Sequence, residues 1–290
     1  MVALALTAAP TIADQDAVAR GERLFRAAGG CGCHAGVEAQ QPAGAAGDLG
    51  GGGSIETPFG TLYGTNITPD SDTGIGRWNE EDFVRSMRMG RGPDGTRYYP
   101  VFPYPAFTLI TDDDLGDLWA YLRSLPAVTR ANRPHALQFP YSLRATAMLW
   151  QWLFLSPGVF EPDASAPDIV NDGRYLATAL GHCQECHTPR TALGTLDAPM
   201  LLAGAADGPE GELAPNITPD DATGIGEWSR ADLTWFLRTG FKPDGDDAQG
   251  LMSELIEHGY GKMSQQDLDA VVAYLQTVPA IENRVTAAQD

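Results

Sequence analysis

The stretch Gly181-His182-Cys183-Gln184-Glu185-Cys186-His187 decides how the rest of the chain folds. Residues three apart on a helix share one face, so Cys183 and Cys186 can point the same way, with His187 directly after them. C-x-x-C-H is the pattern in which two cysteines attach one porphyrin and the histidine binds its iron. A redox disulfide is an alternative, and so is half of a zinc site, although zinc needs two more ligands and none appears nearby. The stretch therefore predicts a covalent c-type haem.

Two copies of one unit make up most of the chain. Asn66-Ile67-Thr68-Pro69-Asp70 recurs as residues 216–220, and Trp78 recurs as Trp228 within a longer match. The offset is 150 residues (216 − 66 and 228 − 78). A period this long indicates duplication of a domain rather than a solenoid. We predict a first domain over residues 16–128, a linker over 129–167 and a second domain over 168–284.

Each unit is predicted to be helical. A short helix comes first, at residues 18–28 and 169–180. A further helix begins after Asn79 or Ser229, both favourable N-caps, and an amphipathic helix over residues 112–125 or 265–278 ends the unit before a proline. Few residues alternate with period two, so the expected class is all-α. The long Gly- and Pro-rich loops are unusual in a compact domain, and a large buried prosthetic group explains them by supplying the core.

The first unit departs from the pattern at its cysteines. Cys31, Cys33 and His34 form C-x-C-H, one residue shorter than the motif in the second unit. Residues two apart on a regular helix do not face the same way. Three outcomes follow: a locally distorted double attachment, a single bond through Cys33, or no haem. His34 is placed to be the proximal iron ligand in either of the first two, as His187 is in the second unit.

The ligand on the opposite side of each iron should come from the second half of its unit. In the second unit the candidates are Met252, Met263 and His258, and Met252 is favoured because it lies in the turn region before the last helix. The offset of 150 pairs Met252 with Phe102 (252 − 102), which cannot bind iron. The first haem is therefore expected to be five-coordinate or to take a substitute ligand, for which Met87, Met89 and His135 are weak candidates.

Several repeated residues are expected near the haem. Asn66, Trp78, Asn216 and Trp228 are candidates for closing the pocket and bonding the propionates, and a purely structural turn role is the alternative. Arg190 follows His187 by three residues and could pair with a propionate.

Charge limits the choice of partners. Lys and Arg number 19, Asp and Glu number 38, and the net charge is −19. Such a chain repels nucleic acid and anionic membranes and favours a basic protein face. The sequence contains no run of 18 or more apolar residues, so no transmembrane helix is predicted. Residues 1–15 read as a signal-peptide remnant or a flexible N-terminus, since a small-residue cleavage site occurs near Ala13 but no basic segment precedes it.

The linker contains an apolar helix over residues 144–155, rich in Trp and Leu. At this length it cannot span a bilayer. It is expected to pack between the domains, to face a partner subunit, or to touch a membrane surface.

The sequence resembles the cytochrome c subunits of membrane-associated periplasmic dehydrogenases, such as bacterial alcohol and gluconate dehydrogenases. The resemblance covers nearly the whole chain after Ala13 and rests on residues 57–78, 91–105 and 181–190. It implies two tandem cytochrome c-type domains, each holding haem c, with Met252 as the second distal ligand. Members of the family have methionine where Phe102 stands and C-x-x-C-H where residues 31–34 stand, and they often carry three haems where this chain has room for two.

The resemblance implies a periplasmic dihaem cytochrome that takes electrons from a partner quinoprotein, flavoprotein or molybdenum dehydrogenase and passes them to a downstream acceptor. We expect an electron-transfer subunit rather than a catalyst. The alternative is a protein that binds a gas or reduces peroxide at an open first haem, although no polar acid–base group is evident near Phe102.

Overall fold

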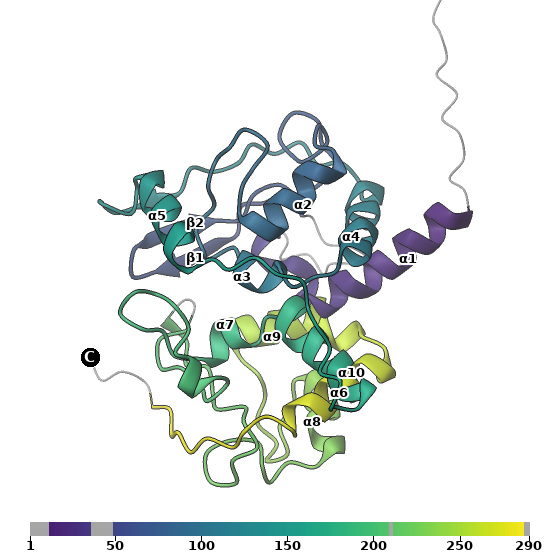
Figure 1. Cartoon of the computed structure of the whole chain (residues 1–290), viewed down its shortest axis with the longest axis vertical. Helices are drawn as coiled ribbons and strands as arrows, with labels where there is room; N and C mark the ends of the chain where they lie inside the picture. Colours follow the sequence, from purple (N-terminus) through teal and green to yellow (C-terminus); the bar gives the residue numbers. More distant parts are fainter. Residues whose placement is uncertain (1–11, 36–48, 209–210, 287–290) are drawn as a thin grey trace, which may run out of the picture.

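The computed structural model describes residues 12–35, 49–208 and 211–286, and it has two helical lobes of similar construction (Figure 1). The first lobe contains α1 (Ile12–Ala27), the 3-10 segment η1 (Gly29–His34), α2 (Glu80–Met89), α3 (Tyr104–Phe107) and α4 (Asp112–Ser124). The second contains α6 (Asp168–Tyr175), the π-helical turn η2 (Leu176–Leu180), α7 (Gln184–His187), the 3-10 segments η3 (Ala198–Met200) and η5 (Tyr260–Lys262), α8 (Arg230–Thr239), α9 (Gly250–His258) and α10 (Gln265–Leu275). Helix α5 (Arg144–Phe154) lies in the linker.

The first and last helices of each lobe cross at a glycine. A Cβ added to Gly21 of α1 would lie 2.0 Å from the Asp117 carbonyl oxygen of α4, and one added to Gly173 of α6 would lie 1.8 Å from the Ala270 carbonyl oxygen of α10. Only a residue without a side chain lets the two backbones approach this closely. The two crossings are equivalent, so the internal repeat of the sequence is also a repeat of the packing.

Capping explains where the middle helices begin and end. The Asn79 and Ser229 side chains each accept a hydrogen bond from a backbone N–H of the first turn, and both helices carry a complete capping box. Each helix ends at a glycine in the left-handed region, Gly90 or Gly240. The predicted starts are therefore confirmed. The first helix begins at Ile12, earlier than the predicted residue 18, and α10 ends at Leu275, before the predicted residue 278.

The expectation of an all-α fold was wrong in one respect, because the first lobe carries a small antiparallel sheet. Strands β1 (Ser54–Thr57) and β2 (Gly60–Tyr63) form a hairpin, and β3 (Ala136–Leu137) from the linker pairs with β2. These strands have four, four and two residues, which is too short for an alternating pattern to be recognised. The start of the linker therefore belongs structurally to the first lobe.

Helix α5 does not form an interdomain core. Ala147 and Gln151 are its buried residues, while Met148, Leu149, Trp152 and Leu153 are at least half exposed. Gln151 fixes the helix to the first lobe by donating to the carbonyl oxygens of Gly90 and Tyr98. Of the interpretations offered for residues 144–155, packing between the domains holds for Trp150, whose indole donates to the Leu193 carbonyl oxygen of the second lobe, and is wrong for the exposed residues.

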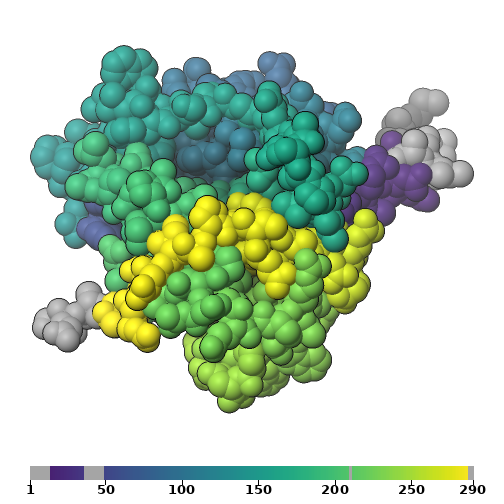
Figure 2. Space-filling model, turned by 60° about the horizontal axis from the view of Figure 1, so that its bottom comes forward, coloured from purple at the N-terminus to yellow at the C-terminus, as the bar shows by residue number. Residues whose placement is uncertain are grey.

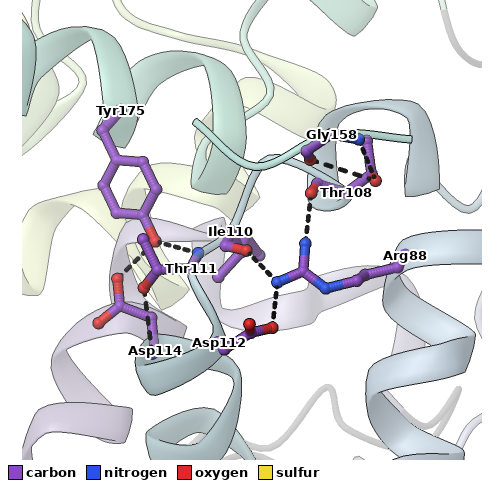
Figure 3. A network of polar contacts seen from close by, with 8 residues as sticks. All are labelled: Arg88, Thr108, Ile110, Thr111, Asp112, Asp114, Gly158 and Tyr175. Atoms are coloured by element: carbon purple, nitrogen blue, oxygen red, sulfur yellow. Dashed lines mark hydrogen bonds and ion pairs between the residues drawn. The ribbon is translucent and has the colours of Figure 1, made fainter. Parts of the chain in front are cut away.

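The two lobes are joined by reciprocal contacts between equivalent positions. Arg23 of α1 forms an ion pair with Asp267 of α10 at 2.5 Å, and Tyr175 of α6 donates a hydrogen bond to Asp114 of α4. Arg23 and Tyr175 are 152 positions apart (175 − 23), and the two aspartates are 153 apart (267 − 114). Each lobe thus places one first-helix side chain on the last helix of the other lobe, as the Tyr175 side of the interface shows in Figure 3.

The C-terminal segment after α10, yellow in Figure 2, crosses the surface of the molecule below the teal linker. It is tied to the second lobe by Asn216, which donates to the Ile281 carbonyl oxygen at 2.7 Å, and by the Asn283 N–H, which donates to Thr223 Oγ1 at 2.9 Å. In the described part of the chain, no helix is both long and apolar enough to cross a membrane. Most of the predicted N-terminal segment, residues 1–11, lies outside the described residues, while residues 12–15 are helical.

Candidate haem sites

The second lobe encloses a cavity of about 380 Å³. Cys183, Cys186 and His187 lie on its wall, and Met252 lies on the wall as well. The rest of the lining is mostly apolar and includes Leu176, Ile217, Ile225, Trp228, Leu233, Phe236, Leu237, Met263, Leu268, Val271 and Leu275. An apolar cavity with a few convergent polar atoms is typical of a cofactor site.

The two cysteines of the second lobe follow a tight turn, with Cys183 at the N-cap of α7 and Cys186 within that helix. His182 adopts a left-handed backbone conformation with φ of 39°, which lets the chain turn from η2 into α7. Burial raises the pKa of the Cys183 thiol to about 11 and that of the Cys186 thiol to about 12. Thiols held neutral in this way are poor metal ligands, and the described residues contain no group of three side chains that could hold a metal ion. The geometry favours thioether attachment over a zinc site.

His187 is oriented by one backbone oxygen. Its Nδ1 lies 2.7 Å from the Pro215 carbonyl oxygen, which can only accept, so Nδ1 carries the proton and Nε2 keeps its lone pair. Burial lowers the pKa of the imidazole and favours its neutral form. A neutral histidine whose second nitrogen is fixed by a carbonyl is the usual arrangement of a metal ligand.

Two methionines reach the same cavity. Met252 lies in the first turn of α9, which the sequence analysis placed in a turn region rather than in a helix, and it is half-buried. Met263 is buried just before α10. His258 is not among the residues that line the cavity. The structure thus brings two of the three candidate distal ligands to the site.

The residues of this cavity fit haem c. Two thiols are available for the vinyl groups, an imidazole nitrogen and a thioether sulfur are available for the iron, and aliphatic and aromatic side chains are available to enclose the ring. The cavity opens partly to the surface, so an edge of a bound porphyrin could remain accessible to a redox partner.

The side chains of the repeated asparagines, Asn66 and Asn216, form hydrogen bonds with backbone groups and with neighbouring threonines. Asn216 is buried, donates to the Ile281 carbonyl oxygen and Thr223 Oγ1, and accepts from the Thr218 N–H and hydroxyl. Asn66 does the same in the first lobe with Val128, Thr73 and Thr68. These bonds favour the structural turn role over propionate binding. Trp78 and Trp228 pack against the core, and Trp228 also lines the cavity.

Arg190 has a protein partner. Its guanidinium lies 2.5 Å from the Glu185 carboxylate and also donates to the Glu185 carbonyl oxygen. The predicted contact with a propionate would have to compete with this ion pair, which ties Arg190 to the middle of the C-x-x-C-H motif.

The first lobe repeats the histidine geometry. His34 Nδ1 lies 2.7 Å from the Thr65 carbonyl oxygen, and Thr65 is 150 positions before Pro215 (215 − 65). The His34 carbonyl oxygen accepts from the Gly51 N–H, as that of His187 does from the Gly204 N–H. Burial again lowers the pKa of the His34 imidazole. His34 is therefore held in the manner of a proximal ligand even though the cysteine spacing is altered.

The short cysteine spacing is accommodated by a left-handed kink. Gly30 has φ of 71° and Cys31 has φ of 54°, so η1 is not a regular helix. The Cys31 side chain packs against the core, whereas Cys33 is exposed. The argument that residues two apart cannot share a face applies to a regular helix and loses its force at this kink. Both a double and a single attachment remain compatible with the backbone.

The distal part of the first lobe is aromatic. Phe102 is half-buried and lies against Tyr98, Tyr104 and Phe107, with ring centroids 5.7, 6.5 and 5.4 Å away. Of the weak candidate ligands, Met89 is exposed, and His135 accepts a hydrogen bond from the Tyr63 N–H at its Nδ1. Met87 is buried in the core cluster.

The two sites adjoin each other. Segment η1 lies directly on α9, so that a Cβ added to Gly30 would come within 2.6 Å of the His258 carbonyl oxygen. Ala27 of the first lobe lines the cavity of the second, and the Phe107 ring lies 5.5 Å from the His182 ring. Sequence reasoning missed these contacts because they depend on how the lobes dock. Their effect is to bring the two attachment segments together at the lobe interface.

Comparison with known proteins gives consistent matches. The family model for cytochrome c matches residues 18–126. A diheme cytochrome c-type protein of Cereibacter sphaeroides is 41% identical over 91% of this chain and 86% of its own length. The gluconate 2-dehydrogenase cytochrome c subunit of Pantoea cypripedii is 37% identical over 91% of this chain and 60% of its own length. The fructose dehydrogenase cytochrome subunit of Gluconobacter japonicus is 39% identical over 93% of this chain and 54% of its own length. The chain thus spans little more than half the length of these two dehydrogenase subunits.

Proposed function

This chain belongs to the cytochrome c family, and we propose that it is a periplasmic dihaem c-type cytochrome that carries electrons from a partner dehydrogenase to a downstream acceptor. The observation that carries the proposal is the repeated histidine: in both lobes an imidazole is fixed by a carbonyl 2.7 Å away at equivalent positions. The names of the relatives support a dehydrogenase as the electron donor. The signal-like segment within residues 1–15 supports export to the periplasm.

Haem iron, when bound, supplies reversible one-electron exchange. The protein's task is then to hold it, exclude water and bring the two sites together. In the second lobe His187 and Met252 are the proposed axial ligands, Cys183 and Cys186 the attachment points, and the apolar lining keeps water from the ring. A histidine–methionine pair raises the potential relative to other ligand sets. The contact of η1 with α9 supports direct electron exchange between the sites.

The exposed face of α5 is the proposed contact with the dehydrogenase. Trp152 is 80% exposed and Leu149 is 54% exposed, and Phe139 nearby is 80% exposed. No acidic residue occurs from residue 118 to residue 160, although 38 of the 290 residues are acidic. An apolar surface free of like charge is typical of a protein interface. The acidic remainder of the surface suits a transient encounter with a basic acceptor, which salt would weaken.

Reduction by a dehydrogenase tests the proposal. The oxidised protein would be mixed with the catalytic subunits of a gluconate, fructose or alcohol dehydrogenase, each with its substrate, and the growth of the ferrous absorption bands followed. We expect reduction that Trp152→Glu slows while the haem spectrum is unchanged, with Trp235→Glu, at an exposed position on α8 of the second lobe, as the control. Absence of reduction by every donor, with both haems present, would contradict the assignment.

A further inference from the structure

We propose that the first lobe binds haem with one axial position free of any protein ligand, and that ferrous iron there takes up a small neutral diatomic molecule such as carbon monoxide or nitric oxide. The inference goes beyond electron transfer and rests on one part of the proposed function, the presence of haem in the first lobe. Its basis is a comparison of the two lobes position by position, since the second lobe carries the proposed methionine ligand, Met252, on the wall of its cavity.

The lobes can be compared closely because equivalent hydrogen bonds join the two ends of the segment that carries Phe102 in the first lobe and Met252 in the second. Arg88 donates to the carbonyl oxygens of Thr108 and Ile110 (Figure 3), and Arg238 donates to those of Gly261 and Met263. The offset is 150 at the arginines (238 − 88) and 153 at the carbonyls (263 − 110). The chain between them is therefore anchored at both ends in the same way, and three residues longer in the second lobe.

Both methionine positions of the second cavity are occupied by residues without sulfur in the first lobe. Met252 corresponds to Phe102 at the offset of 150 that holds at the arginines. Met263 corresponds to Ile110 at the offset of 153 that holds at the carbonyl oxygens. Phe102 is held by three aromatic neighbours, and Ile110 is fully buried. Neither side chain has an atom that can bind iron.

Met87 is the one buried sulfur left to consider in the described part of the first lobe, and its place argues against ligation. It corresponds to Leu237 (237 − 87 = 150), which lines the second cavity as an ordinary apolar wall residue. It sits on α2, which is fixed by the capping box at Asn79 and by Arg88. Met87 therefore fills the position of a leucine rather than that of the distal methionine.

The surroundings of the free position select the ligand. Most of the residues that correspond to the second cavity's lining are apolar and belong to one core cluster, among them Phe25, Ile75, Phe83, Leu115, Leu118 and Leu122. An anion would have to lose its hydration there without a partner. Bound oxygen and peroxide need a hydrogen-bond donor or an acid–base group on the distal side, and Phe102, at the position of the distal methionine, supplies neither. Carbon monoxide and nitric oxide need neither.

Stoichiometric titration with carbon monoxide tests the proposal. The full-length protein would be purified with its covalent haem, the haem content determined by the pyridine haemochromogen assay, and the dithionite-reduced protein titrated with carbon monoxide while the Soret band is recorded. We expect two haems per chain, one of which binds carbon monoxide, and a ferric spectrum that contains one high-spin haem.

Variants that exchange the two distal residues locate the ligand. Phe102→Met should make the first haem low-spin and abolish carbon monoxide binding, whereas Phe102→Leu, which supplies no ligand, should preserve it. Met252→Phe should open the second site, so that two molecules bind per chain. Met87→Leu should change nothing.

Three outcomes would overturn the proposal. A wild-type protein with two haems and no carbon monoxide binding would mean that the first iron has a second protein ligand, identified as Met87 if Met87→Leu then permits binding. Binding that Met252→Phe fails to increase would place the open site in the second lobe. A chain with one haem would remove the premise, and the haem assay reports that result separately from any failure to bind the gas.

Discussion

At the scale of single residues, the second site contains more potential ligands than it needs. Met252 and Met263 both line the cavity. Met263 is bound into the structure through its own carbonyl oxygen, which accepts from Arg238, and its side chain is almost fully buried. Met252 is half-buried in the first turn of α9 and can approach an iron without unpacking the core.

Replacing each methionine separates their roles. Met252→Leu should leave the second haem high-spin and lower its potential, because the thioether that favours reduced iron is gone. Met263→Leu should keep the low-spin spectrum and alter stability only slightly, as volume-conserving core changes do. Absorption spectroscopy with a mediated redox titration measures both effects. A potential that responds to Met263→Leu and not to Met252→Leu would reverse the assignment.

Asn216 tests whether the repeated asparagines act on the fold or on the haem. Asn216→Ala removes the acceptor of the Thr218 N–H and leaves the Ile281 carbonyl oxygen with only its longer bond from the Thr218 hydroxyl at 3.3 Å. This loss should cost on the order of 3 kcal/mol of stability. Asn216→Asp keeps the acceptor for Thr218 but sets a buried carboxylate oxygen against the Ile281 carbonyl oxygen, and should cost at least as much. Thermal unfolding gives the stabilities. A large change in haem potential with little loss of stability would favour propionate binding instead.

At the scale of elements, helix boundaries are set by local chemistry and were therefore readable from the sequence. Asn79 and Ser229 identified the starts of α2 and α8 because a cap depends on residues within one turn. The sheet was missed for the opposite reason, since β3 joins β2 from about 70 residues further along (136 − 63 = 73). Contacts of that range leave no local pattern.

The caps give a direct stability prediction. Ser229→Ala removes the side-chain acceptor for the Asp232 N–H at the start of α8 and should lower stability by about 1 kcal/mol. Ser229→Thr retains a capping hydroxyl and should be close to wild type. Chemical denaturation followed by circular dichroism compares the three proteins. Equal stability of Ser229→Ala and wild type would show that the cap is dispensable once the helix is packed.

At the scale of the whole molecule, the reciprocal interface holds the two sites against each other. Asp267 is buried while the side chain of its partner Arg23 is more than half exposed. Burial raises the pKa of Asp267, but hydrogen bonds from Arg23 and Ser264 outweigh it, and the net effect is a pKa below the ordinary value of 3.8. The pair therefore stabilises the folded protein above pH 3.8, and that contribution is lost as the pH falls through the lower folded-state pKa.

Breaking this pair should loosen the interface. Arg23→Met leaves a buried carboxylate without its main partner and should cost about 1 to 2 kcal/mol at neutral pH, allowing for solvent screening of the exposed guanidinium. The difference from wild type should shrink below pH 3.8, where Asp267 becomes protonated. Urea denaturation across this range provides the measurement. A difference independent of pH would mean that Arg23 acts through packing alone.

The sequence named candidate site residues more readily than their surroundings. Cys183, Cys186, His187 and Met252 could be named as candidates because side-chain type and spacing carry that information, and all four line one cavity. The carbonyl oxygens of Thr65 and Pro215 could not, since every residue has one and only the fold selects which is used. The approach of Ala27 and Phe107 to the second site likewise depends on docking of the lobes.

The most direct test of the account is a peptide map of covalent haem. The protein would be produced with the haem-attachment machinery of its compartment, digested with trypsin, and the peptides containing residues 31–34 and 183–187 weighed by mass spectrometry. We predict that both peptides carry haem, because His34 and His187 are held in the same way in the two lobes. Haem on the second peptide alone would contradict the two-haem relay and leave the first lobe as a docking module or the holder of a non-covalent haem.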